Sequence, residues 1–266
     1  MRRECSVEPG TAAELEKRST GAKFGLAKPD AELELGELTA RLAVLHNRLY
    51  AEHTRALLLV LQGLDASGKD GTIRRVFTGV NPQGCQVESF KEPSHLELDH
   101  DYLWRIHNAL PRRGDIGIFN RSHYEDVTTV QVLGIIGDRT RKRRYGQINA
   151  FERMLYEEGT RIVKVFLHVG KEEQRVRLQR RLDDPERRWK FRADDLHTRA
   201  QWDQYIRLYD EAITATSTKW APWYIVPADH KWVSGLAVAR FLVEALEDMD
   251  PQIPKPAEDL DGVVVE

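Results

Sequence analysis

Apolar residues along this chain gather in short runs that are separated by turn signals. Five of these runs are too short to form a core helix, and they cover residues 57–62, 85–90, 116–119, 162–169 and 224–226. Short apolar runs that are bounded by turn signals are typical of buried strands of a parallel sheet. We therefore expect five parallel strands.

Between these runs, apolar residues recur with helical spacing. Leu38, Leu42, Leu45 and Leu49 follow one another at i, i+4, i+7 and i+11, so they share one face of a helix before the first strand. Further helical patterns cover residues 103–110, 122–133, 148–158 and about 233–246. Gly159 follows the third of these as a helix stop. Strands that alternate with helices predict an α/β fold, a doubly wound parallel five-stranded sheet flanked by helices.

The remaining segments define the domain organisation. Residues 1–29 carry scattered glycine, proline and charge, so we expect an extended N-terminal arm before a single domain of residues 30–250. Residues 171–218 are highly charged and show no strand pattern. They predict two helices joined by a turn at Pro185, which project as a helical lid. The polar, proline-rich residues 251–266 are expected to form a flexible tail.

A glycine-rich loop follows the first predicted strand and precedes a helical pattern. Its sequence, G-L-D-A-S-G-K-D-G-T, matches the G-x-x-x-x-G-K core of a P-loop. Gly63 and Gly68 allow backbone N–H groups to point inward, and Lys69 and the helix N-terminus add positive charge. The candidate phosphate-binding residues of the loop are Gly63, Ala66, Ser67, Gly68, Lys69, Asp70, Gly71 and Thr72.

Two acidic residues set this loop apart from the usual motif. Asp70 stands where Ser or Thr commonly binds Mg²⁺, and Asp65 lies within the loop itself. A carboxylate at about 4 Å from a phosphate charge is repelled by several kcal/mol at an effective dielectric near 20. Asp65 therefore predicts a bridging Mg²⁺ ion. The alternative for both residues is a structural role, in which the carboxylate caps backbone N–H groups.

Polar residues also follow the third predicted strand, in the segment I-G-I-F-N-R-S-H-Y-E-D of residues 116–126. Ligands of open α/β sheets bind at the carboxyl ends of the strands. Asn120 stands where P-loop enzymes usually carry an acidic metal ligand, so ligation is shared with or shifted to Glu125 and Asp126. Arg121 is a candidate internal arginine finger, and a structural salt bridge is its alternative role.

The charge of the chain excludes a general attraction to polyanions. Its 40 Lys and Arg nearly cancel 42 Asp and Glu, which gives a formal net charge of −2. Partners such as nucleic acid or a membrane surface are therefore not expected. Local basic clusters at residues 139–144, 175–181 and 186–192 instead suggest a track for a long polyanion, although solvated helix faces explain single arginines equally well.

From its cysteines and its first residues we expect a cytoplasmic protein. Cys5 and Cys85 form no C-x-x-C pair, so we expect two free thiols and no disulfide or thiolate metal site. The first residues lack the apolar core of a secretory signal. No apolar run approaches the roughly 20 residues that span a bilayer.

Several longer stretches resemble the polyphosphate kinase 2 family, P-loop enzymes with a nucleoside monophosphate kinase-like core and a helical lid. The matching stretches include the phosphate loop, V-N-P-Q-G-C-Q-V, S-F-K-E-P-S, H-D-Y-L-W-R, G-I-F-N-R-S-H-Y-E-D-V and T-S-T-K-W-A-P-W-Y-I-V-P-A-D-H-K-W. The resemblance covers residues from about 30 to 248. The F-N-R-S-H-Y-E-D form is similar to the branch called class III, whose members phosphorylate both AMP and ADP.

The resemblance implies which ligands the protein binds and near which residues each ligand lies. Inorganic polyphosphate would lie along the phosphate loop, with Mg²⁺, or Mn²⁺ in its place, near Asp65, and AMP, ADP or ATP on the opposite side, guanine nucleotides included. Lys69, Arg121 and Lys91 would contact phosphates, and the lid arginines Arg175 and Arg181 match less specifically. The candidate metal ligands remain those read from the residues, Asp65, Asn120, Glu125 and Asp126, of which the resemblance supports Asp65. Family members are commonly dimers or tetramers, so a homo-oligomer is expected.

These observations together predict in-line phosphoryl transfer between polyphosphate and a nucleotide, with Asp65, Lys69 and Arg121 as the catalytic residues. The sequence offers no arrangement of a nucleophile and a base, so no covalent protein intermediate is expected. An ATP-dependent nucleoside monophosphate or small-molecule kinase would use the same loop for ATP. A non-catalytic, nucleic-acid-binding P-loop protein is the second alternative, with Trp189 and Phe191 as stacking or core residues.

Overall fold

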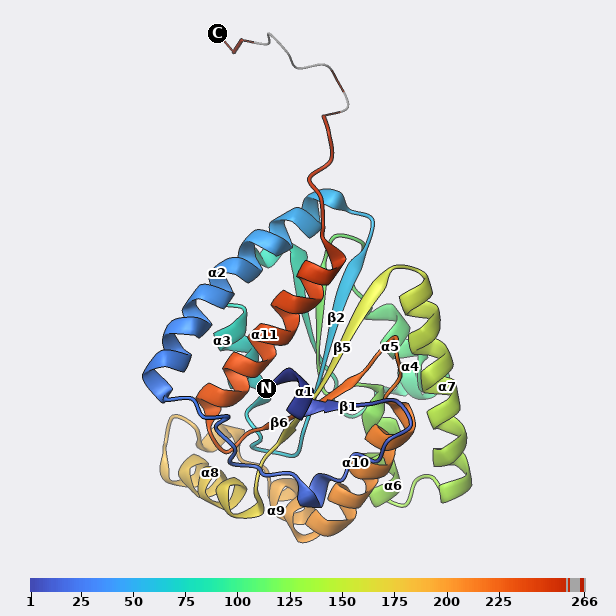
Figure 1. Cartoon of the computed structure of the whole chain (residues 1–266). Helices are drawn as coiled ribbons and strands as arrows, with labels where there is room; N and C mark the ends of the chain where they lie inside the picture. Colours follow the sequence, from blue (N-terminus) through green and yellow to red (C-terminus); the bar gives the residue numbers. More distant parts are fainter. Residues whose placement is uncertain (257, 259–263, 266) are drawn as a thin grey trace.

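A six-stranded sheet forms the centre of the molecule, which we describe from a computed structural model at residues 1–256, 258 and 264–265 (Figure 1). The parallel strands are β2 (Ala56–Gln62), β3 (Cys85–Ser89), β4 (Ile116–Asn120), β5 (Thr160–His168) and β6 (Trp223–Pro227). The strand order is β1-β6-β5-β2-β4-β3. The five predicted parallel strands are therefore confirmed. The expected burial is wrong for β3, which lies at the edge of the sheet and has no buried residue.

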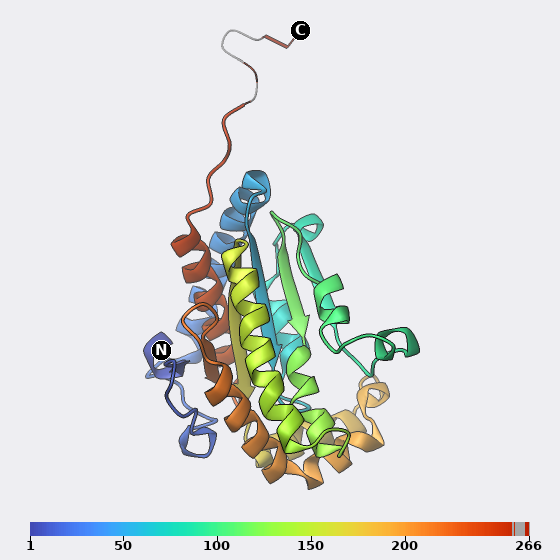
Figure 2. The ribbon, with the colours of Figure 1, turned by 90° about the vertical axis from the view of Figure 1, so that its right-hand side faces the viewer.

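The central strands are apolar because helices cover both faces of the sheet. Every residue of β2 and of β6 is buried, and β5 is buried over its last seven residues. The long helices α2 (Lys28–Glu52) and α11 (Lys231–Met249) and the short α3 (Lys69–Val76) lie on one face (Figure 2). The other face carries α7 (Asp138–Glu157) and α10 (Trp202–Thr216). This three-layer arrangement is the predicted α/β fold.

The first helix buries the predicted apolar face. Leu42, Leu45 and Leu49 of α2 are at most 2% exposed, and Leu38 is partly buried against the same core. The helix packs alongside α11, as Figure 1 shows. At its end, His53 adopts a left-handed conformation and the chain turns into β2.

Two helices differ from the prediction. The pattern at residues 122–133 forms a 3-10 turn, η3 (His123–Asp126), and a separate short helix, α6 (Thr129–Val132). The Ser122 hydroxyl accepts a hydrogen bond from the backbone N–H of Tyr124, which fixes this turn at the end of β4. Helix α7 begins at Asp138, ahead of the predicted residue 148. Its first turns are almost wholly charged, so they carry too few apolar residues to show helical spacing.

The N-terminal arm contributes a sixth strand, which corrects the predicted count of five. The arm contains a short helix, α1 (Arg2–Cys5), the strand β1 (Ser6–Val7) and the 3-10 turn η1 (Leu15–Lys17). β1 pairs with β6 in the antiparallel direction. Val7 and Leu15 are buried in the main core, and this burial holds the arm against the body. A strand of two residues is too short to produce a periodic signal in the sequence.

The charged segment after β5 forms more helices than expected. Helix α8 (Lys171–Asp183) ends just before Asp184 and Pro185, as predicted, and is followed by η4 (Arg188–Lys190), α9 (Ala193–Ala200) and α10. Buried aromatic residues anchor α10 in the core: Trp202, Tyr205 and Tyr209. The segment thus comprises three α-helices and a 3-10 turn where two helices were expected.

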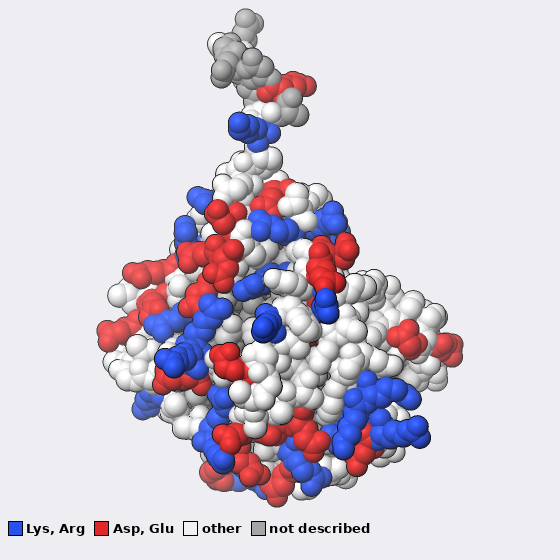
Figure 3. Space-filling view, turned by 45° about the vertical axis from the view of Figure 1, so that its right-hand side comes forward, with Lys and Arg blue, Asp and Glu red and all other residues white. Residues whose placement is uncertain are grey.

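The ends and the surface complete the fold. Residues 251–256 form no helix or strand, and most of the rest of the predicted tail lies outside the described residues. Cys5 and Cys85 are both free thiols, and burial raises the pKa of each to about 12. Within the described residues, no helix has the length and apolar character needed to cross a membrane. In Figure 3, basic and acidic side chains mix over the upper left and the lower edge of the face, and a group of Lys and Arg lies at its lower right.

Candidate active site

The phosphate loop lies at the carboxyl end of β2, where the chain turns into α3. Gly63, Ala66 and Gly68 have φ angles of 148°, 62° and 107°, so the loop curls through left-handed conformations. A Cβ atom at Gly63 would lie 2.7 Å from Ser67 Oγ and 2.8 Å from the Leu167 carbonyl oxygen. Glycine is therefore required at position 63 both for its φ angle and for the close approach of β5.

Lys69 points back into the loop that precedes it. Its Nζ atom donates to the carbonyl oxygens of Gly63 at 2.6 Å and of Leu64 at 3.3 Å, and the residue is only 8% exposed. Burial, and after it the nearby Arg121 guanidinium, lowers the pKa of Lys69 to about 8. An anion in the loop would favour the charged form of this side chain.

Two hydroxyl groups of the loop are buried without a hydrogen-bond partner among the described residues. They are Ser67 Oγ and Thr72 Oγ1, on either side of Lys69 in the sequence. Buried polar groups are nearly always hydrogen-bonded, so an unpartnered hydroxyl needs an explanation. Phosphate oxygens held by the loop would supply the missing acceptors.

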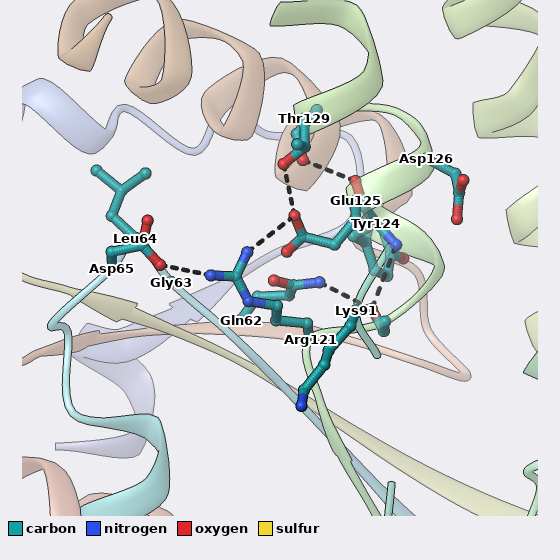
Figure 4. A network of polar contacts seen from close by, with 12 residues as sticks. Gln62, Gly63, Leu64, Asp65, Lys91, Arg121, Tyr124, Glu125, Asp126 and Thr129 are labelled. Carbon is teal, nitrogen blue, oxygen red and sulfur yellow. Dashed lines mark hydrogen bonds and ion pairs between the residues drawn. The ribbon is translucent and has the colours of Figure 1, made fainter. Parts of the chain in front are cut away.

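Arg121 joins the phosphate loop to the end of β4. Its guanidinium contacts the Asp65 carboxylate and lies 3.4 Å from Glu125 Oε2, so one cation lies between two carboxylates (Figure 4). The Glu125 carboxylate, helped by Asp65, holds the pKa of Arg121 well above its usual range against the effect of burial. Arg121 has a φ of 66°, and its backbone N–H donates to Leu61. The predicted catalytic residues Asp65, Lys69 and Arg121 therefore lie together.

The other predicted metal ligands lie in different surroundings. Asn120 donates its side-chain amide to Asp70 at 2.8 Å, so its carbonyl oxygen stays available. Asp126 points away from Glu125 in Figure 4 and lies 3.5 Å from Arg105. Burial raises the pKa of the Asp126 carboxyl, although Arg105 opposes this effect. Asp65 and Glu125 are brought together, and Asp126 is not.

The predicted phosphate contacts outside the loop are less tightly held. Lys91 is exposed just beyond β3, and its carbonyl oxygen accepts a 2.8 Å hydrogen bond from Arg105. Arg175 is paired with Glu172 on the surface of α8. Arg181 lies 3.6 Å from Asp195 Oδ2 at the start of α9.

Comparison with known proteins assigns the family. Residues 25–254 match the family model described as Polyphosphate kinase 2. The chain belongs to the polyphosphate kinase 2 family. An AMP/ADP-polyphosphate phosphotransferase from Meiothermus ruber is 51% identical over 232 residues, 87% of each chain. An ADP-polyphosphate phosphotransferase from Rhodopseudomonas palustris is 47% identical over 227 residues, 81% of this chain and 78% of the relative.

A solved structure shares the fold of this polyphosphate kinase 2 chain. The crystal structure of polyphosphate kinase 2 from Arthrobacter aurescens superimposes with a TM-score of 0.90 at 40% sequence identity. The match covers 96% of this chain and 92% of the other. The predicted family and fold are thus confirmed.

One residue that sequence reasoning did not single out braces the phosphate loop of this polyphosphate kinase 2 chain. Arg177 of α8 donates through Nη1 to the carbonyl oxygens of Ala66 and Ser67, at 3.0 Å each. Its Nη2 atom donates to Ala228 at 2.6 Å and to Asp229 at 2.9 Å, in the turn before α11. Arg177 therefore fixes the loop against two neighbouring elements. Nothing in the charged sequence of α8 distinguishes it from the surface arginines beside it.

A buried polar network supports the turn that carries Glu125. Lys164 of β5 is fully buried and donates to Glu152 at 2.6 Å, to the Tyr124 hydroxyl at 2.8 Å and to the Thr216 carbonyl at 2.7 Å. A buried ion pair is costly unless its hydrogen bonds are satisfied, and these are. Because Tyr124 directly precedes Glu125, the network helps to position the η3 turn beside Arg121.

Proposed function

We propose that this polyphosphate kinase 2 transfers phosphoryl groups between inorganic polyphosphate and AMP or ADP. The observation that carries the proposal is the meeting of Lys69, two unpartnered loop hydroxyls and Arg121 at one edge of the sheet. Such a site binds phosphate chains through the placement of its hydrogen-bonding groups and through its positive charge. The family and the names of the two relatives give the donor and the acceptor class.

The residues support in-line transfer without a covalent protein intermediate. Backbone N–H groups of the curled loop and the Lys69 ammonium would hold the phosphates on one side of the transferred group. Arg121, already held by Asp65 and Glu125, would stabilise the charge that spreads over the transferring phosphoryl oxygens. The helices after β5 would cover the site and exclude water. The phosphoryl group would then pass to the nucleotide and not to water.

We propose Mg²⁺, with Mn²⁺ as a substitute, as the metal of this site. Asp65 and Glu125 present carboxylate oxygens to one position, now satisfied by Arg121, and Asn120 keeps an oxygen free. Among the described residues no group of three acidic, His or Cys side chains could form a complete cage. Mg²⁺ commonly uses one or two carboxylates together with substrate phosphates and water, so the residues fit it. Bound there, the ion would neutralise phosphate charge.

The direct test supplies purified protein with ADP, polyphosphate and Mg²⁺ in the absence of ATP. ATP formation is the expected result. A protein that phosphorylates acceptors only when ATP is supplied would be an ATP-dependent kinase instead. Offering AMP, ADP, GMP and GDP in parallel determines the base preference and the choice between mono- and diphosphate acceptors.

Further measurements address the metal and the assembly. Asp65→Asn should raise the Mg²⁺ concentration needed for half-maximal rate, whereas Asp126→Asn should leave it almost unchanged because Asp126 pairs with Arg105. Equal shifts in both variants would remove Asp65 as the preferred ligand. We further propose a homo-oligomer, dimer or tetramer, on the family resemblance, and analytical ultracentrifugation measures it.

A further inference from the structure

The N-terminal arm is fixed to the body close to the point where β5 leads into α8. We call residues 13–20 of the arm the strap. Figure 1 shows the arm running from the start of α2 to α10. The backbone N–H of Leu15 donates to Asp210 Oδ1 of α10 at 2.6 Å, and the carbonyl oxygen of Leu15 lies 3.0 Å from Nε2 of the buried His168 at the end of β5. The strap is thus held on both sides of the chain segment that enters α8.

The strap ends on Asp229, in the turn between β6 and α11. The Thr20 hydroxyl donates to Asp229 Oδ2 at 2.6 Å, and the backbone N–H of Asp229 donates to the Thr20 carbonyl oxygen at 3.1 Å. The other carboxylate oxygen, Oδ1, accepts a 2.7 Å hydrogen bond from the backbone N–H of Gly170, the residue at the N-terminal cap of α8. One carboxylate therefore joins the strap to the start of α8.

Asp229 supplies an acceptor that a helix commonly provides for itself. In a capping box, an acidic side chain three residues beyond the cap accepts a hydrogen bond from the N–H of the cap residue. Glu173 has that position in α8, but its carboxylate accepts a 2.8 Å hydrogen bond from Arg177 Nε. Asp229 binds the N–H of Gly170 instead, and its negative charge lies at the positive end of α8. The placement of the first turn of α8 therefore depends on Asp229.

Helix α8 in turn holds the phosphate loop at two places. Arg177 binds the carbonyl oxygens of Ala66 and Ser67, and Gln174 donates through Nε2 to the Asp65 carbonyl oxygen at 3.0 Å. Gln174 is fully buried. Both side chains belong to the first two turns of α8, so a displacement of the helix start would displace the backbone of the loop as well.

We propose that Asp229 is a positioning residue for phosphoryl transfer and that the strap takes part in the reaction through it. The inference rests on the proposed function. Asp229 acts through other groups, because it fixes the start of α8 and α8 fixes the loop that leads to Lys69. A misplacement of about 1 Å at the reacting groups lowers a rate by up to about a hundredfold. Affinity for polyphosphate is spread over many contacts, so a loosened α8 should lower kcat more than it raises KM.

The first test measures kcat and KM with polyphosphate and ADP. Asp229→Ala removes both acceptors, and kcat should fall about tenfold with little change in KM. Asp229→Asn keeps an oxygen for the Gly170 N–H and gains an amide that donates to the Thr20 hydroxyl, so it should retain most of kcat. Thr20→Val should lower kcat about threefold. Thr11→Val is the matched control in the same arm, because its hydroxyl bonds only to the nearby Glu8 carbonyl, and it should leave kcat unchanged.

Hydrogen exchange separates positioning from a general loss of stability. In Asp229→Ala, the backbone amides of residues 63–69 and 170–177 should exchange faster than in the wild type. Their increase should exceed that of residues 160–167 in β5 about tenfold, because the loop and α8 open locally while β5 opens only with the whole domain. Thr20→Val tests the same route if Asp229→Ala does not fold.

The outcomes also separate this inference from the proposed function. A lower unfolding temperature with unchanged kcat and unchanged loop exchange would make Asp229 a purely structural residue and overturn the inference. A rise in KM alone would overturn it too, and so would an equal loss of kcat in Asp229→Asn, which keeps both hydrogen bonds. A wild-type protein that accepts only ATP as the donor would contradict the proposed function alone, and the same variants measured with ATP would still test Asp229.

Discussion

The side-chain amide of Asn120 donates a 2.8 Å hydrogen bond to the carboxylate of Asp70. This contact joins the end of β4 to the first turn of α3, so it fixes the phosphate loop relative to Arg121. An amide is able to donate to Asp70, whereas an aspartate at position 120 would place two carboxylates together. The contact therefore explains why asparagine suits this position when position 70 is aspartate.

Asn120→Asp should lower the free energy of unfolding in metal-free buffer at neutral pH. The loss should be about 0.5–1 kcal/mol, because Asp70 is largely exposed and solvent screens the repulsion. The double variant Asn120→Asp with Asp70→Asn exchanges the two side chains. It again pairs one amide donor with one carboxylate acceptor. Urea unfolding of the wild type and both variants measures the effect. A double variant no more stable than Asn120→Asp would contradict the assigned contact.

Lys69→Ala should reduce phosphoryl transfer by more than about a hundredfold while the protein stays folded. The substitution removes the cation that the loop encloses. Steady-state rates with polyphosphate and ADP give the effect, and circular dichroism verifies the fold. The matched control is Lys219→Ala, an exposed residue before β6 at the opposite end of the sheet, which should leave the rate nearly unchanged. Near wild-type turnover in Lys69→Ala would refute the role of this lysine.

The lowered pKa of Lys69 predicts an alkaline limit to activity. The charged amine binds phosphate, and it loses its proton as the pH rises through about 8. The value of kcat/KM for polyphosphate should therefore fall with increasing pH around that point, since it reports the free enzyme. Bound phosphates favour the charged form, so kcat should fall only at higher pH. A kcat/KM profile that is flat between roughly pH 7 and 9 would contradict the assignment.

Arg177→Gln should destabilise the protein and impair catalysis together. The change leaves carbonyl oxygens of the loop and of the turn before α11 without their donor, at a cost of about 3 kcal/mol. Because the loop loses its brace, kcat should fall as well as the affinity for polyphosphate. Chemical unfolding and steady-state kinetics measure both effects.

Glu173→Gln is the control for this variant. It weakens the 2.8 Å pair with Arg177 Nε but keeps the four carbonyl contacts. We expect it to retain most of the stability and of kcat. If Arg177→Gln raised only KM with unchanged kcat, Arg177 would be a simple binding residue and not one that positions the loop.

The sequence predicted the parts of the molecule that repeat a simple physical pattern. The buried strands appear as apolar runs because helices cover both of their faces, and the phosphate loop appears because its glycines have fixed spacing. The strand β1 was not predicted, because two residues are too few to show the alternation of apolar and polar residues that marks a strand. Helix α7 was predicted too short because its first turns are nearly all charged.

The site residues show why side-chain roles were harder to predict. Arg175 and Arg177 lie on the same helix, yet the side chain of the first is 56% exposed and that of the second 6%. The face of α8 that meets the loop is the one that carries Arg177, which binds the loop and the turn before α11, and the charged sequence of α8 gives no sign of it. Glu125 and Asp126 are neighbours with the same chemistry, but the η3 turn sends them in opposite directions.

We expect the pairing of β1 with β6 to limit self-association of the protein in solution. β1 covers part of one rim of the sheet, where the backbone of Trp223 and Tyr224 would otherwise be open to another chain. Exposed strand edges recruit further strands and lead to aggregation. Trimming the first seven residues would therefore be expected to make the protein self-associate, even though every group assigned to phosphate binding would still be in place.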